Sequence, residues 1–207
     1  MTKFDPISLK ILWDRLVSIS DELVLSLVRT SFSMNVREGY DLSCMVFDSK
    51  ARLLTQGSYS VPSFTGTAPK TIQHMLKKFP PETLVLGDVI MTNDPWMGTG
   101  HLFDINVMRP VFKGKKLVGY TMSVTHLPDI GGKGMSSDCT EIYHEGLRLP
   151  VCKLQDKGRL NELIVDLIRT NVRVPEQTIG DLMANVCLLY TSPSPRDLST
   201  SRMPSSA

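Results

Sequence analysis

Two segments rich in β-branched and apolar residues flank a short polar turn in the middle of the chain. Residues 104–112 (DINVMRPVF) and 117–126 (LVGYTMSVTH) are typical of strands, and the sequence KGKK between them is typical of a turn. The spacing predicts an antiparallel β-hairpin centred near Gly114 and Lys115. Pairing from that turn places residue 104 opposite 125 and residue 103 opposite 126, within one step of register. Pro110 has no amide hydrogen to donate, so we expect its strand to lie at an edge or beside a bulge.

The predicted hairpin brings two histidines and one aspartate toward the same place. Asp104 begins the first strand, His126 ends the second, and His101 lies just before Asp104 on a glycine-containing loop. Two neutral imidazoles and one carboxylate form a set that suits Mn, Fe or Zn and leaves positions open for water or substrate. We therefore predict that these three residues bind a divalent metal ion. The alternative is that the histidines are ordinary hydrogen-bonded or surface residues at the end of a strand.

Residues after the hairpin offer further candidates. Asp129 follows His126 by three residues, so it can join the metal ligands or accept a hydrogen bond from an imidazole, and we assign it the role of catalytic base or support. The glycine-rich run 131–134 can form an anion-binding turn or simply a turn. Glu141 and Glu145, with His144 between them, can act as acid and base or belong to a charged surface turn. Glu38 and Asp41 lie near Arg37 and are expected in a solvated loop or a local ion pair.

Several classes of protein are not supported by the sequence. It has neither the G-x-x-x-x-G-K-[ST] nor the G-x-G-x-x-G nucleotide-binding pattern. The net charge is +2 with scattered basic residues, so we expect no nucleic-acid partner. No run approaches the roughly 18 apolar residues that a membrane span needs. The four cysteines form no C-x-x-C pair and no secretory signal precedes them, so we expect a cytoplasmic protein.

The remaining patterns predict an α+β fold with a long N-terminal helix, antiparallel hairpins and C-terminal helices. Asp5-Pro6 caps a helix whose apolar residues recur at helical spacing to about residue 30. The other expected elements are a hairpin over 42–47 and 52–55, a short helix over 69–78, an interrupted strand over 83–92, a helix over 159–172 and a helical segment from Pro175.

The last 21 residues, 187–207, change abruptly to a Ser- and Pro-rich composition. They resemble the translation of a sequencing-library adaptor, and a disordered tail is the alternative. We therefore expect residues 1–186 to be the native part and residues 187–207 to be a non-native tail.

A series of motifs in one order makes residues 5–186 resemble the N-terminal third of the hydantoinase B/oxoprolinase family. The motifs are NVREGYDLSC, LTQG, GDVIMTNDPWMGTGHLFDI, HLPDIGGKG, TEIYHEGLRLP and NVRVPEQTIGDLMA. The resemblance implies that the chain is part of a larger, metal-dependent subunit of an ATP-dependent cyclic-amide hydrolase of the N-methylhydantoinase or 5-oxoprolinase type. It also implies a HyuA-like partner subunit, which would hold ATP and activate the substrate oxygen as a phosphoryl ester.

In the acetone carboxylase branch of this family, a histidine, an aspartate three residues later and a second histidine hold Mn. Those positions match His101, Asp104 and His126. The resemblance thus implies the same metal site, in a hetero-oligomer acting on a small cyclic amide or ketone. Two alternatives stay open: a subunit of a ketone carboxylase, and a non-catalytic metal or assembly module. We expect the fragment alone to be inactive.

Overall fold

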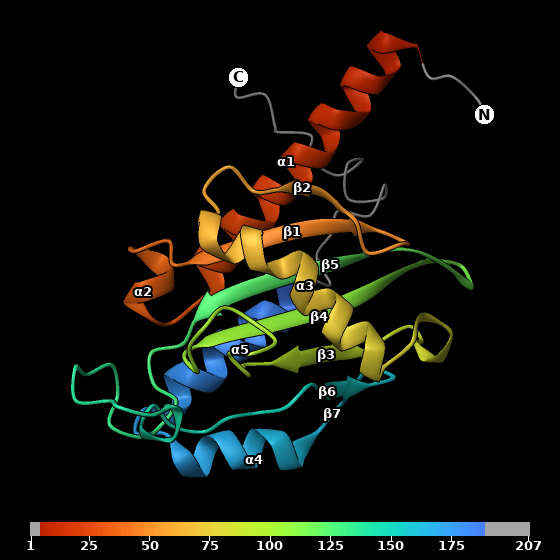
Figure 1. Ribbon diagram of the computed structural model, residues 1–207. Helices are drawn as coiled ribbons and strands as arrows, with labels where there is room; N and C mark the ends of the chain where they lie inside the picture. The colour runs from red at the N-terminus through yellow and green to blue at the C-terminus, as the bar shows by residue number, and fades with distance from the viewer. Residues whose placement is uncertain (1–4, 189–207) are drawn as a thin grey trace, which may run out of the picture.

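The predicted central hairpin lies in the middle of a seven-stranded sheet (Figure 1). The computed structural model describes residues 5–188. The strand order is β2-β1-β5-β4-β3-β6-β7, and all neighbouring strands are antiparallel. The strands are β1 (Leu42–Asp48), β2 (Leu53–Gln56), β3 (Val89–Thr92), β4 (Asp104–Lys113), β5 (Lys116–His126), β6 (Cys152–Asp156) and β7 (Arg159–Leu160).

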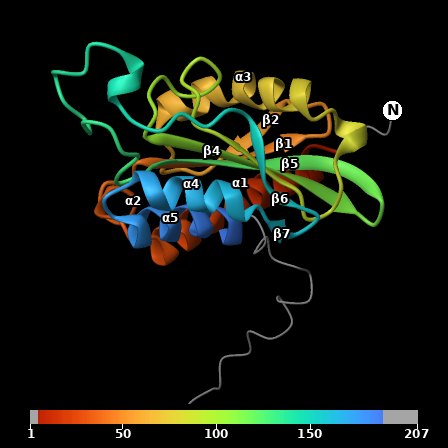
Figure 2. The ribbon, with the colours of Figure 1, turned by 90° about the horizontal axis from the view of Figure 1, so that it is seen from below.

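Helices cover both faces of this sheet (Figure 2). Helix α3 (Pro62–Lys78) lies on one face, and α1 (Pro6–Thr30), α2 (Met34–Arg37), α4 (Glu162–Asn171) and α5 (Pro175–Leu188) lie on the other. Successive side chains of a strand point to opposite faces, so β3 sends Val89 and Met91 into the core under α4 and α5, and Ile90 into the core under α3. The α+β expectation is confirmed. Within residues 5–188, no helix is long and apolar enough to cross a membrane.

The long N-terminal helix and the hairpin of β1 and β2 form as expected. Asp5 caps α1 through its Oδ1, which accepts hydrogen bonds from the amides of Ile7 and Ser8 at 3.1 and 3.0 Å. The expected C-terminal helices are α4 and α5, although β7 occupies the first two residues of the range expected for α4. The predicted non-native tail lies outside the described residues from position 189 onward.

The helix predicted over residues 69–78 is longer than expected. It begins at Pro62, and Pro69 lies inside it. Proline removes one backbone hydrogen bond in a helix interior, which favoured a start at Pro69. However, the apolar stripe Phe64, Ala68, Ile72 and Met75 is buried along the whole helix and offsets that loss. The strand expected over 83–92 is shorter and comprises only Val89–Thr92, since a turn with positive φ at Gly87 precedes it.

Candidate metal centre

A β-bulge places Asp104 and His126 on the same face of the sheet. Near the turn, Lys113 pairs with Lys116, as the expected turn requires. Val118 of β5 has no partner in β4, so the register shifts by one residue between Val111 and Phe112. The shifted register continues to the other end of the hairpin, where Asp104 lies opposite His126. Without the bulge, Asp104 would lie opposite Thr125 and His126 would point to the other face. The prediction was therefore one step off in register, within its stated margin.

Strand β4 is an interior strand, so of the two positions expected for Pro110, an edge or a bulge, the structure shows the bulge. Its neighbour β3 pairs only with Asn106, Val107 and Met108. Pro110 lies beyond that pairing and pairs with Tyr120 of β5 on the other side. At Pro110, β4 therefore has only one described strand neighbour, β5. Its partner Tyr120 lies two residues from Val118, the unpaired residue of the bulge.

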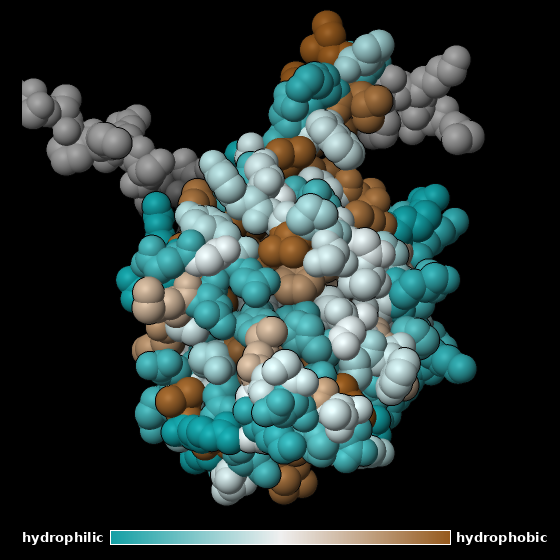
Figure 3. Space-filling model, turned by 60° about the vertical axis from the view of Figure 1, so that its left-hand side comes forward, coloured by the Kyte–Doolittle hydropathy of each residue, from teal (hydrophilic) through white to brown (hydrophobic). Residues whose placement is uncertain are grey.

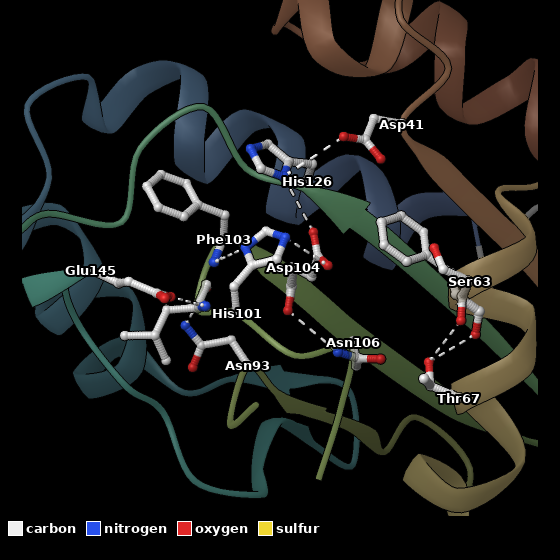
Figure 4. A network of polar contacts seen from close by, with 12 residues as sticks. Asp41, Ser63, Thr67, Asn93, His101, Phe103, Asp104, Asn106, His126 and Glu145 are labelled. Atoms are coloured by element: carbon white, nitrogen blue, oxygen red, sulfur yellow. Dashed lines mark hydrogen bonds and ion pairs between the residues drawn. The ribbon is translucent and has the colours of Figure 1, made fainter. Parts of the chain in front are cut away.

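The three predicted ligands converge at this end of the hairpin (Figure 4). Nε2 of His101 lies 3.1 Å from Oδ2 of Asp104, and Nδ1 of His126 lies 3.2 Å from Oδ1 of the same carboxylate. One ligand atom from each of the three residues lies within 4.8 Å of the other two. Asp104 is 1% exposed and His126 is 7% exposed, whereas His101 is partly open to solvent.

The segment that carries His101 is held by side chains from distant parts of the chain. The side-chain amide nitrogen of Asn93 donates to the carbonyl oxygens of Leu102 and Leu147, at 2.8 and 2.9 Å. Its side-chain oxygen accepts from the backbone amide of Leu149 at 2.6 Å. The Glu145 carboxylate accepts a hydrogen bond from the Leu102 amide at 2.8 Å. These hydrogen bonds fix the backbone next to His101, as a preorganised site requires.

Aromatic packing fixes His126. The Phe103 ring stacks on the His126 imidazole with a centroid distance of 5.3 Å and an interplanar angle of 7°. The backbone amide of His126 donates to the Asp41 carbonyl oxygen at 3.1 Å, and Oδ2 of Asp41 lies 3.7 Å from Nδ1 of His126. Asp41, expected in a solvated loop, is thus half-buried beside the site because β1 pairs with β5 there.

The charged groups shift one another's pKa values. The close contact with the Asp104 carboxylate raises the pKa of His101, although burial opposes this. Burial acts to raise the pKa of Asp104, but its contacts with His101 and His126 outweigh that effect and hold the pKa below its usual range. Burial raises the pKa of Asp41, and the nearby histidines offset only part of the increase.

The donor set fits a divalent cation. Two imidazole nitrogens and one carboxylate are ligands that Zn, Mn and Fe accept, and three protein ligands leave coordination positions open. In addition, Oδ2 of Asp104 is buried and, despite the nearby His101 ring, has no well-aligned hydrogen-bond donor among the described residues. A buried carboxylate oxygen without such a donor is costly unless a cation satisfies it.

Asp129 does not join this group of three. Its Oδ1 accepts from the Gly131 amide at 2.9 Å and from the Arg173 guanidinium at 3.1 Å. Its Oδ2 accepts from the Arg173 amide. Asp129 therefore ties the start of α5 to the turn that follows His126. Its role as a base stays a prediction.

The glycine-rich run and the acidic pair Glu141 and Glu145 have partners within the protein. The Arg173 guanidinium donates to the carbonyl oxygens of Gly131 and Gly132, so this turn binds a cationic side chain. The Lys133 amide donates to the His144 carbonyl oxygen. Glu141 pairs with the His144 ring at 3.2 Å, and only Glu145 of the acidic pair faces the site.

Two hollows lie beside the three residues. One, of about 440 Å³, is lined by His101, Phe103, Glu145 and the loop 134–139. The other, of about 410 Å³, lies beside His126 and includes Phe103, Asp129 and Arg173 in its lining. Cavities of this size accept small organic molecules.

Comparison with known proteins gives one consistent result. The family model described as hydantoinase B/oxoprolinase matches residues 5–190. The chain is 35% identical over 187 residues to the beta subunit of the caprolactamase of Pseudomonas jessenii, covering 89% of this chain and 32% of that protein. It is 31% identical over 192 residues to one subunit of a putative D-/L-hydantoinase of a Pseudomonas species, covering 90% of this chain and 32% of that protein.

The fold agrees with this relationship. The crystal structure of the ATP-dependent caprolactamase from Pseudomonas jessenii superposes with a TM-score of 0.82 at 30% identity, covering 96% of this chain and 34% of that one. The chain thus spans about a third of the length of these relatives.

Proposed function

The chain belongs to the hydantoinase B/oxoprolinase family, and from this we propose that it is the metal-binding part of one subunit of an ATP-dependent cyclic-amide hydrolase. The observation that carries the proposal is the convergence of His101, Asp104 and His126 beside two hollows of small-molecule size. Relatives named as caprolactamase and putative hydantoinase subunits support this substrate class.

In this proposal, His101, Asp104 and His126 hold one divalent ion. When bound, such an ion acts as a Lewis acid or lowers the pKa of a water molecule. Asp104 orients both imidazoles because its two oxygens face different rings. Phe103 stacks on His126 and limits the access of water to it. A small cyclic amide fits either hollow, where its carbonyl carbon can approach the three residues.

Asp129 acts as a support in this scheme. Three donors already hold its oxygens, so abstracting a proton would require breaking its contacts with Arg173. Asp41 lies closer to the ligands and has one carboxylate oxygen near His126.

We propose that a HyuA-like partner holds ATP and activates the amide, since the sequence lacks both nucleotide-binding patterns.

Metal binding is tested with the chain itself. After removal of metal with a chelator, equilibrium dialysis against Mn²⁺ or Zn²⁺ should give one bound ion per chain, and His126→Ala should abolish it. His74 is exposed on α3, so His74→Ala is a matched control that should retain the ion. Equal binding by both variants would refute the proposed site.

The reaction is tested with a protein of the relatives' length and its ATP-binding partner. We expect metal- and ATP-dependent opening of a lactam or hydantoin ring that His126→Ala eliminates. Bicarbonate-dependent carboxylation of a ketone would instead identify a carboxylase. If His126→Ala lowered metal content and thermal stability but left turnover unchanged, the metal would be structural.

A further inference from the structure

The first half of α1 carries an apolar stripe that the other described residues leave largely uncovered. Leu9 is 57% exposed and Trp13 is 50% exposed, whereas Leu16 is partly buried. This part of α1 projects beyond the sheet (Figure 1), and hydrophobic side chains lie along it at the top of Figure 3. Large apolar side chains gathered in this way mark a contact surface.

The stripe continues into a packed interface on the same helix. At helical spacing, Leu9, Trp13 and Leu16 lie in line with Ser20, Leu23 and Leu27, which are all buried. The buried part packs against β1 and α5, where Ala184 shares a cluster with Leu23 and Leu27. One face of α1 is therefore buried in its second half and open in its first half.

Helix α5 runs antiparallel to α1 along this face. Oδ1 of Asp181 accepts hydrogen bonds from the amides of Phe32 and Ser33, just beyond the C-terminal end of α1. Three residues later, Ala184 belongs to the same buried cluster as Leu23, Val24 and Leu27. Later residues of α5 are thus closer to the projecting end of α1. Leu9 precedes Leu23 by 14 residues and Phe32 by 23, so at an equal rise per residue in both helices roughly 10 to 16 helical residues after Leu188 would reach Leu9.

We propose that, in a protein of the relatives' length, the polypeptide that follows α5 packs as a helix on the stripe Leu9, Trp13 and Leu16. This chain spans about a third of its relatives, so they possess ample polypeptide for this contact. The contact would extend the interface between α1 and α5 without a break. A tethered segment also meets the stripe at a high effective concentration, which favours it over a second copy of the chain.

The test follows the fluorescence of Trp13. Trp96→Phe leaves Trp13 as the only tryptophan of the chain. Two proteins are compared. The first is the 207-residue chain. In the second protein, residues 189–207 are replaced by the segment that follows the matched region in the beta subunit of the caprolactamase. Burial of the indole should shift its emission to shorter wavelength and reduce acrylamide quenching about twofold or more.

Two substitutions of equal chemistry on opposite faces of α1 provide the control. Leu9→Asp should cancel the protection of Trp13 in the extended chain, whereas Ile11→Asp, on a residue that is 63% exposed, should leave it intact. If the extended chain does not fold, the same segment is added as a synthetic peptide to the 207-residue chain. Equal quenching of Trp13 in the two proteins would overturn the proposal. So would protection of Trp13 in the 207-residue chain that accompanies dimer formation, measured by sedimentation, because a second copy would then cover the stripe.

Discussion

Asp104 lies almost wholly buried between two imidazoles, and each of its oxygens faces a different ring. A buried carboxylate is costly unless positive charge or hydrogen-bond donors compensate for it. The contacts with His101 and His126 hold the pKa of Asp104 down against the effect of burial. The same atoms can therefore serve as a metal site and as a hydrogen-bonded cluster.

This cluster predicts a pH dependence of stability in the presence of a chelator. The pKa of His101 is raised above 6.5, so its stabilising contribution is fully present below pH 6.5 and is lost as pH rises through the folded-state pKa. The pKa of Asp104 is lowered below 3.8, so its contribution is present above pH 3.8 and is lost as pH falls through the folded-state value. In urea unfolding experiments, the free energy of unfolding of the unsubstituted protein should fall as the pH rises from about 6 to about 8.

His101→Ala should remove most of that loss over the same range of pH, and His74→Ala should retain it. An identical pH profile in the two variants would show that the cluster with Asp104 does not form in solution.

Asn93 holds together three backbone segments beside the site. Asn93→Ala leaves the Leu149 amide without its partner and frees two carbonyl oxygens. We expect the free energy of unfolding to fall by about 3 kcal/mol, because unsatisfied buried polar groups cost about 1–3 kcal/mol each. Urea denaturation checks this. Asn171→Ala, at an exposed position, should cost less than about 0.5 kcal/mol, and equal losses in both variants would contradict the bracing role of Asn93.

At the scale of elements, the hairpin could be predicted from sequence, but its bulge could not. The apolar runs and the turn at Gly114 and Lys115 determine which strands pair. Val118 has no partner in β4, and the non-local pairing of β5 with β1 runs only from Gly119 to Thr125, so no local pattern marks the unpaired residue. Register at a distance from a turn is therefore predictable only to within a step. The start of α3 could not be predicted either, because tertiary burial outweighed the effect of Pro69.

Gly119 next to the bulge shows how tightly β5 packs against β1. A Cβ atom at this position would lie 2.4 Å from the carbonyl oxygen of Phe47, whereas one at Gly66 on α3 would meet nothing within 4 Å. Gly119→Ala should therefore lower the free energy of unfolding by about 1–3 kcal/mol, and Gly66→Ala should raise it by about 0.5–1 kcal/mol. Chemical denaturation of both variants checks the two signs, and a stabilising Gly119→Ala would show that the strands are farther apart.

At the scale of the molecule, the sequence predicted the family and the convergence of His101, Asp104 and His126, whereas the surroundings of these residues come from distant contacts. Asp41 reaches the site through the pairing of β1 with β5, and Glu145 reaches it through a long loop. Neither contact has a local sequence signal. Arg173 is also distant from the hairpin, yet it holds Asp129 and the turn after His126.

The central claim is that His101, Asp104 and His126 bind one divalent ion. The most direct measurement is a crystal structure of the protein grown with MnCl₂, with anomalous data collected at the manganese edge. One strong peak is expected at about 2.0–2.3 Å from an imidazole nitrogen of each histidine and from an Asp104 oxygen. A map with no peak between these residues, in which both imidazoles still contact Asp104 directly, would contradict it.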